Sequence, residues 1–188
     1  QGSVQEALSR LPGRHGTVHA AGRTDAGVHA LAMTAHVDTT SALPVEKLRL
    51  ALNAHLPRDV AVLEVRDVAA DFEAQFDCLY RRYLYRMRVV RGRPRGLALD
   101  RDRVLMVHRE LDVAAMIAAA PRFEGRRDFS SLATQETRTG ERTVLACELR
   151  DELGGLRLHV AADGFLRGMV RAIVGTLLMV GIASAISV

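Results

Sequence analysis

The sequence predicts an α+β fold in which a mixed, mostly antiparallel sheet is flanked by helices. Residues 28–37 and 81–89 alternate between apolar and polar side chains with the two-residue period of β-strands. Residues 45–56 instead repeat their apolar side chains at helical spacing. The Gly154-Gly155 pair separates two β-prone runs, as the turn of a hairpin does. Helices and hairpins mixed in this way favour helices packed on one face of a sheet.

Residues 1–70 are expected to form an N-terminal half that ends before a connecting segment. The predicted elements are a helix at 4–11, strands at 17–20 and 28–37, a helix at 45–56 and a strand at 60–68. Proline is tolerated at the start of a helix and disfavoured in its interior, so Pro44 and Pro57 mark the two ends of the second helix.

Residues 71–188 are expected to form a C-terminal half. The predicted elements are a strand at 81–89, a helix at 112–120, strands at 144–149 and 156–162, and an apolar helix that follows Gly164. Asp112 is placed to cap the first of these helices. We interpret residues 125–132 as a structural loop, whereas residues 133–143 are polar and have no clear role.

The composition is that of a soluble protein with a mild basic excess. Of 188 residues, 48% are apolar and 26% are charged, with a formal net charge of +4. Lys47 is the only lysine, so the positive charge is nearly all arginine, which suits multi-donor contacts with phosphate. Cys78 and Cys147 form neither a disulfide framework nor a metal pattern, and we expect reduced thiols and no zinc site.

The N-terminus does not resemble a signal peptide, because no basic region is followed by an apolar run, and the most apolar stretch is at the C-terminus. Residues 169–188 are interrupted by an arginine, two glycines and two serines, which favours a buried helix over a membrane span. The sequence begins inside a predicted helix without methionine and ends in apolar residues. We therefore expect a cytoplasmic protein of which this chain is a piece, shortened at both ends.

One stretch places a cation, a hydroxyl and a carboxylate next to one another between two glycines. It reads Gly-Arg-Thr-Asp-Ala-Gly-Val-His at residues 22–29, between two predicted strands. A carboxylate at Asp25 would be held on a tight loop yet stay reachable from solvent, and Arg23 is close enough to bind an anionic substrate beside it. The alternative is a plain turn in which the aspartate and threonine bond their own backbone.

Residues 81–89 form the second notable stretch. Tyr83 and Tyr85 share one face of the predicted strand, and Arg82 lies on the other. An ordinary sheet, with tyrosines in the core and arginines in water, would have the same pattern. The basic loop at residues 91–96 could contact RNA phosphates or could be a solvated turn.

The third stretch reads Asp-Gly-Phe-Leu-Arg-Gly-Met-Val-Arg at residues 163–171. The helix that follows is apolar nearly all round, which predicts that it is largely buried. Arg167 and Arg171 lie four residues apart on one side of it. A buried arginine needs a carboxylate partner, so any nearby aspartate or glutamate could fill that role.

These three stretches resemble, in the same order, the three motifs of the TruA-type tRNA pseudouridine synthases. The resemblance implies two similar halves with a central cleft, a homodimer, and isomerisation of uridine in the anticodon stem-loop of tRNA without metal or cofactor. It implies that Asp25 acts as nucleophile or base, that Tyr83 stacks on the target base, and that Arg171 pairs with Asp25. It also assigns substrate contacts, for which our candidates are Arg23, Thr24, Arg82, Arg167 and Val170. The family often has histidines where this chain has Arg167-Gly168, which leaves the role of Arg167 open.

Two other classes of function compete with an isomerase. A non-catalytic RNA-binding or RNA-folding module would use the same basic surface, but it has no chemical need for Asp25. A glycoside hydrolase would need a second carboxyl group as general acid, for which Asp77 or Asp163 are the candidates.

Overall fold

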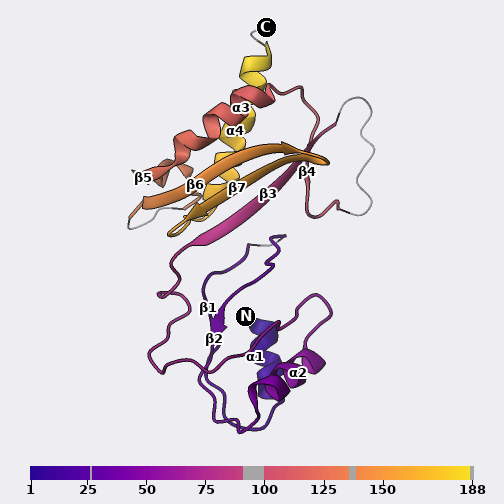
Figure 1. Cartoon of the computed structure of the whole chain (residues 1–188), viewed down its shortest axis with the longest axis vertical. Coiled ribbons are helices and arrows are strands. Elements are labelled where there is room, and N and C mark those ends of the chain that lie inside the picture. Colours follow the sequence, from indigo (N-terminus) through magenta and orange to yellow (C-terminus); the bar gives the residue numbers. More distant parts are fainter. Residues whose placement is uncertain (26, 91–99, 136–138, 187–188) are drawn as a thin grey trace. The chain divides into compact units, whose positions relative to one another are not determined.

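The computed structural model describes residues 1–25, 27–90, 100–135 and 139–186. The chain divides into two compact units, Gln1–Cys78 and Leu79–Val188, which we describe separately (Figure 1). The predicted boundary near residue 70 falls in the last part of the first unit. The basic loop at residues 91–96 lies outside the described residues.

The N-terminal unit is built from helices α1 (Gly2–Ser9) and α2 (Val45–His55) and two short strands, β1 (His19–Ala20) and β2 (Ala35–His36). Both helices were predicted, because their apolar side chains recur at helical spacing. Their buried faces supply most of a small core, which consists of Ala7, Leu8, Val18, Leu48 and Leu52.

An antiparallel ribbon, residues 14–21 against 34–40, crosses this unit. His19 pairs with His36 in β1 and β2, and hydrogen bonds from Ala21 N to Thr34 O (2.9 Å) and from Gly16 N to Asp38 O (2.8 Å) extend the ladder at its two ends. Helix α1 supports the ribbon, because the Gln5 side chain accepts from Val18 N at 2.7 Å and donates to Gly16 O at 3.0 Å. The ribbon therefore presents residues 22–33, which we call the Asp25 loop, at its tip.

The three predicted strands of this unit are shortened or absent, and the strand expected at 17–20 is reduced to His19–Ala20. In the predicted strand at 28–37 only Ala35–His36 is strand, because pairing with the other arm stops at Thr34. Leu31, one of its expected buried positions, is 89% exposed. The described residues 60–68 contain no strand. There the Asn53 amide takes the place of a neighbouring strand, since it donates to Val62 O at 2.9 Å and accepts from Val62 N at 2.8 Å.

The C-terminal unit contains a five-stranded sheet in the order β4-β3-β7-β6-β5. Its strands are β3 (Arg81–Val89), β4 (Leu105–Val107), β5 (Gly125–Asp128), β6 (Glu141–Glu152) and β7 (Gly155–Ala162). Only the β3–β4 pair is parallel, so the prediction of a mixed, mostly antiparallel sheet is confirmed for this unit. The two units carry sheets of different size, and the similarity of the two halves stays a prediction.

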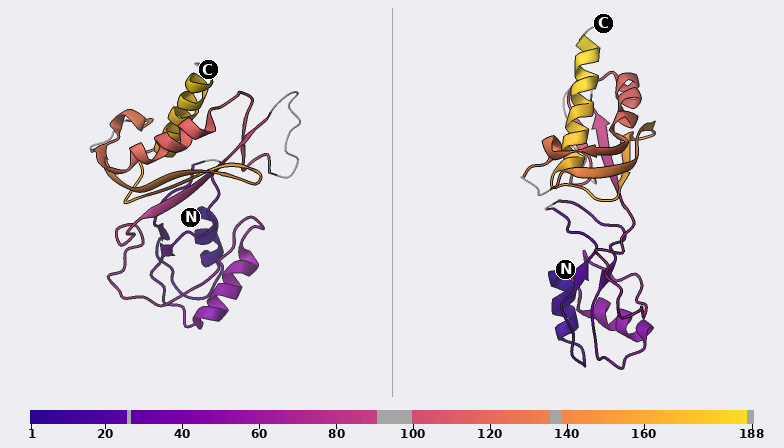
Figure 2. Two further views of the ribbon diagram at one scale, coloured as in Figure 1. Left: turned by 45° about the horizontal axis from the view of Figure 1, so that its top comes forward. Right: turned by 90° about the vertical axis from the view of Figure 1, so that its left-hand side faces the viewer.

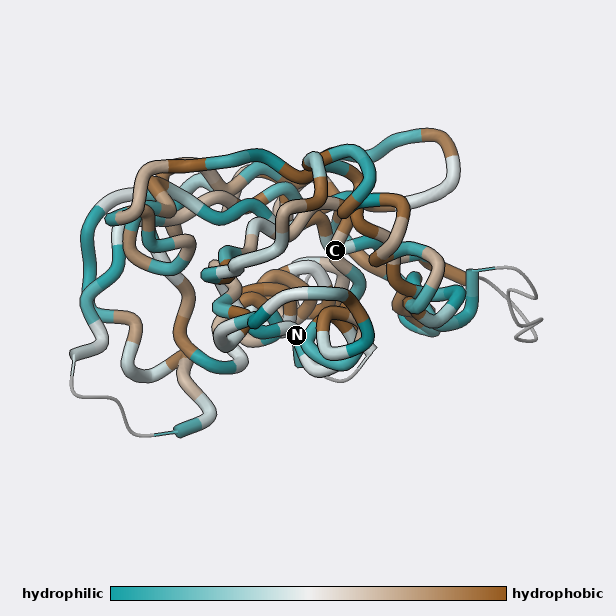
Figure 3. Tube along the Cα trace, turned by 90° about the horizontal axis from the view of Figure 1, so that it is seen from below, coloured by the Kyte–Doolittle hydropathy of each residue, from teal (hydrophilic) through white to brown (hydrophobic). Residues whose placement is uncertain are grey.

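Helices α3 (Val113–Ala119) and α4 (Met169–Ile186) pack together on one face of the sheet (Figures 1 and 2). Two short 3₁₀ helices, η1 (Ala120–Phe123) and η2 (Ser130–Leu132), lie between the strands in sequence. The predicted cap of α3 is confirmed, since Asp112 Oδ1 accepts from Ala115 N at 2.9 Å. Apolar and polar residues alternate at short intervals along much of the trace, as expected of elements that bury one face (Figure 3).

Helix α4 is less buried than predicted. Met169, Ile173 and Leu177 are fully buried and form the core with the sheet, whereas Arg171 is exposed and Met179 is 71% exposed. An apolar helix packed on a sheet needs only one stripe inside, so an arginine on the other side keeps its contact with water. Among the described helices, α4 alone is long and apolar enough to cross a membrane. For a single helix that packs on a core, length and composition are weak evidence of a membrane span.

Residues 125–132 have the structural role that was predicted for them. Asp128 Oδ1 accepts from Ser130 Oγ at 2.6 Å and from Ser130 N at 2.8 Å, so β5 ends in a tight turn. These hydrogen bonds favour the carboxylate and lower the pKa of Asp128, with the side-chain bond contributing most. Gly140 approaches this turn closely, because a Cβ there would lie 2.1 Å from Asp128 Oδ1.

The two cysteines differ in environment, which gives a simple test of the core. Burial, with a smaller contribution from the charge of Glu124, raises the pKa of Cys147 from 9.0 to about 12. Cys78 is only partly buried. We expect iodoacetamide at pH 8 to label Cys78 in the native protein and to label Cys147 only after unfolding, because the Cys147 thiol is buried and its raised pKa leaves very little reactive thiolate. Peptide mass spectrometry would detect this, and equal labelling of both cysteines in the native protein would contradict the buried position of Cys147.

Candidate active site

The backbone of the Asp25 loop makes a turn at Asp25. Val28 N donates to Asp25 O at 3.0 Å, and Gly27 has a φ of +81°, a conformation that a glycine adopts without steric cost. Arg23, Thr24 and Asp25 are all exposed. The ribbon thus presents the cation, the hydroxyl and the carboxylate to solvent, as predicted from the sequence.

Tyr83 lies on β3 and faces the core side of the sheet. The predicted alternation along this strand is confirmed, because Tyr83 and Tyr85 pack against the core while Arg82 and Leu84 are exposed on the other face. The ring of Tyr83 meets Phe165 edge to face, with centroids 5.0 Å apart and planes at 87°. This contact is the point where the second and third sequence motifs meet.

The segment before α4 is held in place by backbone contacts from other elements. Arg81 Nη1 donates to Asp163 O at 3.0 Å, and Thr134 donates to Arg167 O from its N (2.8 Å) and its Oγ1 (3.1 Å). Gly168 has a φ of +81°, and a Cβ there would come within 2.4 Å of Thr134 Cγ2. The Arg167 carbonyl is therefore structural, while its side chain is exposed.

Val170 and Arg171 are the last two residues of the third motif and lie in the first turn of α4. Val170 is half-buried against the core, and Arg171 projects from the exposed side in the first turn of the helix. The prediction that Arg171 is buried where α4 packs on the rest of the unit is wrong. Asp25 belongs to the N-terminal unit and Arg171 to the C-terminal unit, and their ion pair stays a prediction.

The two carboxylates that a hydrolase could recruit have structural partners. Asp77 Oδ2 accepts from Glu73 N at 2.8 Å, and Asp163 Oδ1 accepts from Thr143 N at 3.0 Å. Both carboxylates therefore accept a backbone N–H, as aspartates that cap turns do. Among the described residues, no group of three or more histidine, cysteine, aspartate or glutamate side chains is arranged to hold a metal ion.

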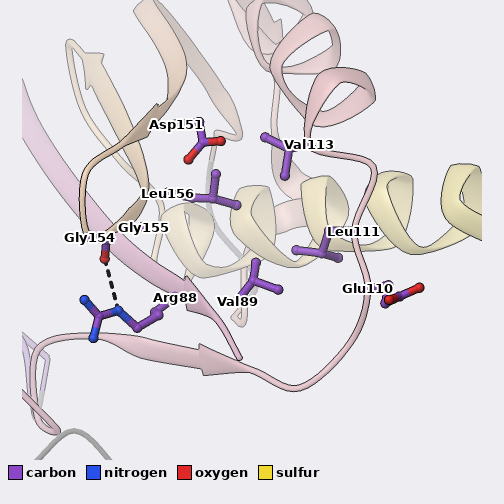
Figure 4. Close-up of a pocket in the computed structure, with 9 residues that line it drawn as sticks. All are labelled: Arg88, Val89, Glu110, Leu111, Val113, Asp151, Gly154, Gly155 and Leu156. Carbon is purple, nitrogen blue, oxygen red and sulfur yellow. Dashed lines mark hydrogen bonds between the residues drawn. The ribbon is translucent and has the colours of Figure 1, made fainter. Parts of the chain in front are cut away.

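A pocket of about 520 Å³ lies elsewhere in the C-terminal unit, at the end of β3 and beside the β6–β7 hairpin (Figure 4). Val89, Leu111 and Leu156 supply apolar lining, while Arg88 is turned to the hairpin and donates to Gly154 O at 3.2 Å. The described residues that line it include none of the predicted catalytic or substrate-binding side chains. This pocket is therefore distinct from the candidate active site.

Comparison with known proteins identifies the class. The family model described as "tRNA pseudouridine synthase" matches residues 1–77 and 119–185. A tRNA pseudouridine synthase A of Thermus thermophilus is 49% identical over 186 residues, 97% of this chain and 72% of the relative. Namesakes from Afipia carboxidovorans (40% identical over 96% of this chain and 74% of the relative) and Syntrophomonas wolfei (39% over 96% and 72%) match similarly.

The α+β fold and these matches define an RNA-modifying isomerase. The chain belongs to the tRNA pseudouridine synthase family, whose enzymes convert uridine to pseudouridine. This confirms the resemblance that the three sequence motifs indicated.

Two contributions to the site were not foreseen in the sequence. Thr134, in a stretch without an assigned role, holds the Arg167 carbonyl. His36 lies in the predicted strand at 28–37 and had no role of its own, yet its Nδ1 accepts from Ala74 N at 3.0 Å. Both contacts join segments far apart in sequence, so the local sequence pattern does not reveal either of them. The one available signal was a histidine within a mainly apolar strand pattern, which can indicate a side chain that forms a tertiary contact.

Proposed function

We propose that this protein isomerises uridine to pseudouridine in the anticodon stem-loop of tRNA. The observation that carries the proposal is the Asp25 loop, in which an ionisable carboxylate lies exposed at the tip of a supported ribbon, with Arg23 and Thr24 beside it. Membership of the tRNA pseudouridine synthase family supports it independently.

In the proposed reaction Asp25 acts at the ribose of the target uridine. The carboxylate attacks C1′ or removes the 2′ proton, and the N1–C1′ bond breaks. The freed uracil turns and C5 bonds to C1′, which breaks the Asp25–C1′ ester in the first route and is accompanied by return of the 2′ proton in the second. The C5 proton then leaves and N1 gains a proton, so the product is an isomer of the substrate. Since every atom is retained apart from exchanged protons, the reaction requires no redox agent.

The remaining predicted residues have roles in reaching and holding the base. A uridine must leave the helical stack before its sugar is accessible, and Arg23 would fill the vacated space or grip an adjacent phosphate, with Thr24 beside it. Tyr83 would stack on the extruded uracil, a contact worth on the order of 1–3 kcal/mol. Arg171 would pair with Asp25 and favour its ionised form.

Arg82, Arg167 and Val170 complete the proposed substrate contacts. Arg82 and Arg167 are exposed and would bind phosphates, which position RNA without reading its sequence. The half-buried Val170 would close the apolar side of the pocket. We further propose a cytoplasmic homodimer with tRNA as its partner.

The test measures tritium release from tRNA that carries 5-tritiated uridine, because formation of the C5–C1′ bond expels that tritium and binding does not. We expect release from intact tRNA and none from a matched tRNA whose anticodon stem-loop uridines are replaced by cytidine. Equal release from both would contradict the proposed position. Binding without release from either, in a protein that is folded by circular dichroism, would favour an RNA-binding or RNA-folding module instead.

A further inference from the structure

A cluster of rings lies at the middle of the ribbon that carries the Asp25 loop. His19 and His36 are directly opposite each other on β1 and β2, and their rings stack with centroids 5.2 Å apart and planes at 15°. Phe72, from the end of the N-terminal unit, meets the His36 ring edge to face at 6.1 Å. The cluster therefore joins the ribbon to residues 69–78, which we call the connector.

One hydrogen bond fixes this junction. Ala74 N donates to His36 Nδ1 at 3.0 Å, which requires Nδ1 to be unprotonated and places the proton of the neutral ring on Nε2. Nε2 in turn faces Glu73 Oε2 at 3.5 Å. Ala74 is 2% exposed, so water cannot readily replace the histidine as acceptor for its N–H.

The connector is itself a rigid turn. Asp77 Oδ2 accepts from Glu73 N, and Asp77 N donates to Glu73 O, both at 2.8 Å. Phe76 N also donates to Glu73 O at 3.0 Å. A turn closed in this way holds Ala74, whose N–H is the donor to His36, in one conformation.

We propose that His36 is a positioning residue, which clamps the connector to the ribbon and so holds the ribbon that carries the Asp25 loop in one place within the N-terminal unit. The inference rests on the proposed function, in which Asp25 and Tyr83 act on one uridine. Small errors in the placement of reacting groups are costly in rate, so a loose connector would slow the chemistry while leaving phosphate contacts intact.

Substitutions of His36 that keep different parts of the ring test this. Asparagine places an acceptor oxygen near the position of Nδ1, glutamine reaches the position of Nε2, and leucine keeps the bulk alone. We expect His36→Asn to retain most of the single-turnover rate, and His36→Gln and His36→Leu to lose about ten- to a hundredfold. The Kd for tRNA is expected to stay unchanged in all three. His55→Leu, at an exposed position of α2, is the matched control and should behave as the parent.

Hydrogen exchange of the Ala74 amide, measured by ¹⁵N NMR on the same chain, reports on the hydrogen bond between Ala74 and His36 independently of catalysis. Slow exchange in the parent and His36→Asn, with fast exchange in His36→Gln and His36→Leu, is expected. Full rate in His36→Leu despite fast exchange would overturn the positioning role, as would equal losses in all three variants. A parent that shows slow exchange but releases no tritium would instead refute the proposed function on which that role rests.

Discussion

Asp25→Asn is expected to bind tRNA as the parent does and to lose tritium release by on the order of 10³-fold or more. Asparagine has nearly the shape of aspartate, and the backbone hydrogen bond from Val28 N to the Asp25 carbonyl is available to either residue. It has no ionised oxygen with which to attack C1′ or to remove the 2′ proton. An interaction needed only in the transition state lowers kcat and leaves KM nearly unchanged.

The control for this variant removes the same charge from the same ribbon. Asp38 is exposed, and it contributes its carbonyl to the ladder through Gly16 N. Asp38→Asn should therefore match the parent in rate and in tRNA affinity. If Asp25→Asn also released tritium at the parental rate, the carboxylate would have no chemical role and Asp25 would be a turn residue only.

Gly155→Ala is expected to destabilise the C-terminal unit by about 3 kcal/mol or more. Gly155 has a φ of +127°, and a Cβ there would lie 2.3 Å from Met87 O on the neighbouring strand β3. The strained backbone costs roughly 1–2 kcal/mol, and overlap with a backbone atom in a packed sheet adds about 1–3 kcal/mol. The midpoint of urea unfolding, followed by far-UV circular dichroism, would measure the loss.

Gly154 offers a matched comparison one residue away. Its φ is +102°, but the nearest atom to an added Cβ is Arg88 Nη2 at 3.8 Å, at the end of a flexible side chain. Gly154→Ala should therefore carry the backbone strain alone, about 1–2 kcal/mol. Equal destabilisation by the two variants would show that the approach of Gly155 to Met87 O has no energetic consequence.

The sequence predicts well those elements whose pattern matches their burial. Residues 81–89 alternate and are strand throughout, because both neighbours, β4 and β7, are present to pair with β3. Residues 28–37 also alternate, though less sharply, yet only two of them are strand. Alternation records which side chains can face a core, whereas a strand also needs a partner, and that partner is set by tertiary structure.

The candidate site was predictable to a different degree. The Asp25 loop and Tyr83 were singled out because their motifs resemble those of the family, since spacing alone is equally compatible with a plain turn and an ordinary sheet. The exposure of Arg171 was not predictable, since apolar neighbours on all sides do not reveal which stripe of α4 meets the sheet. The contact between His36 and Ala74 was also hidden, because 38 residues separate its two ends.

The two outermost strands of the sheet have a consequence for solubility. β4 and β5 occupy the ends of the strand order, and they are only three and four residues long. Every residue of β5 is exposed, and its sequence, Gly-Arg-Arg-Asp, is mostly charged. A short, charged outer strand is a poor template for another chain, so β5 protects its edge of the sheet against aggregation, while β4 limits pairing at the other edge by its length alone.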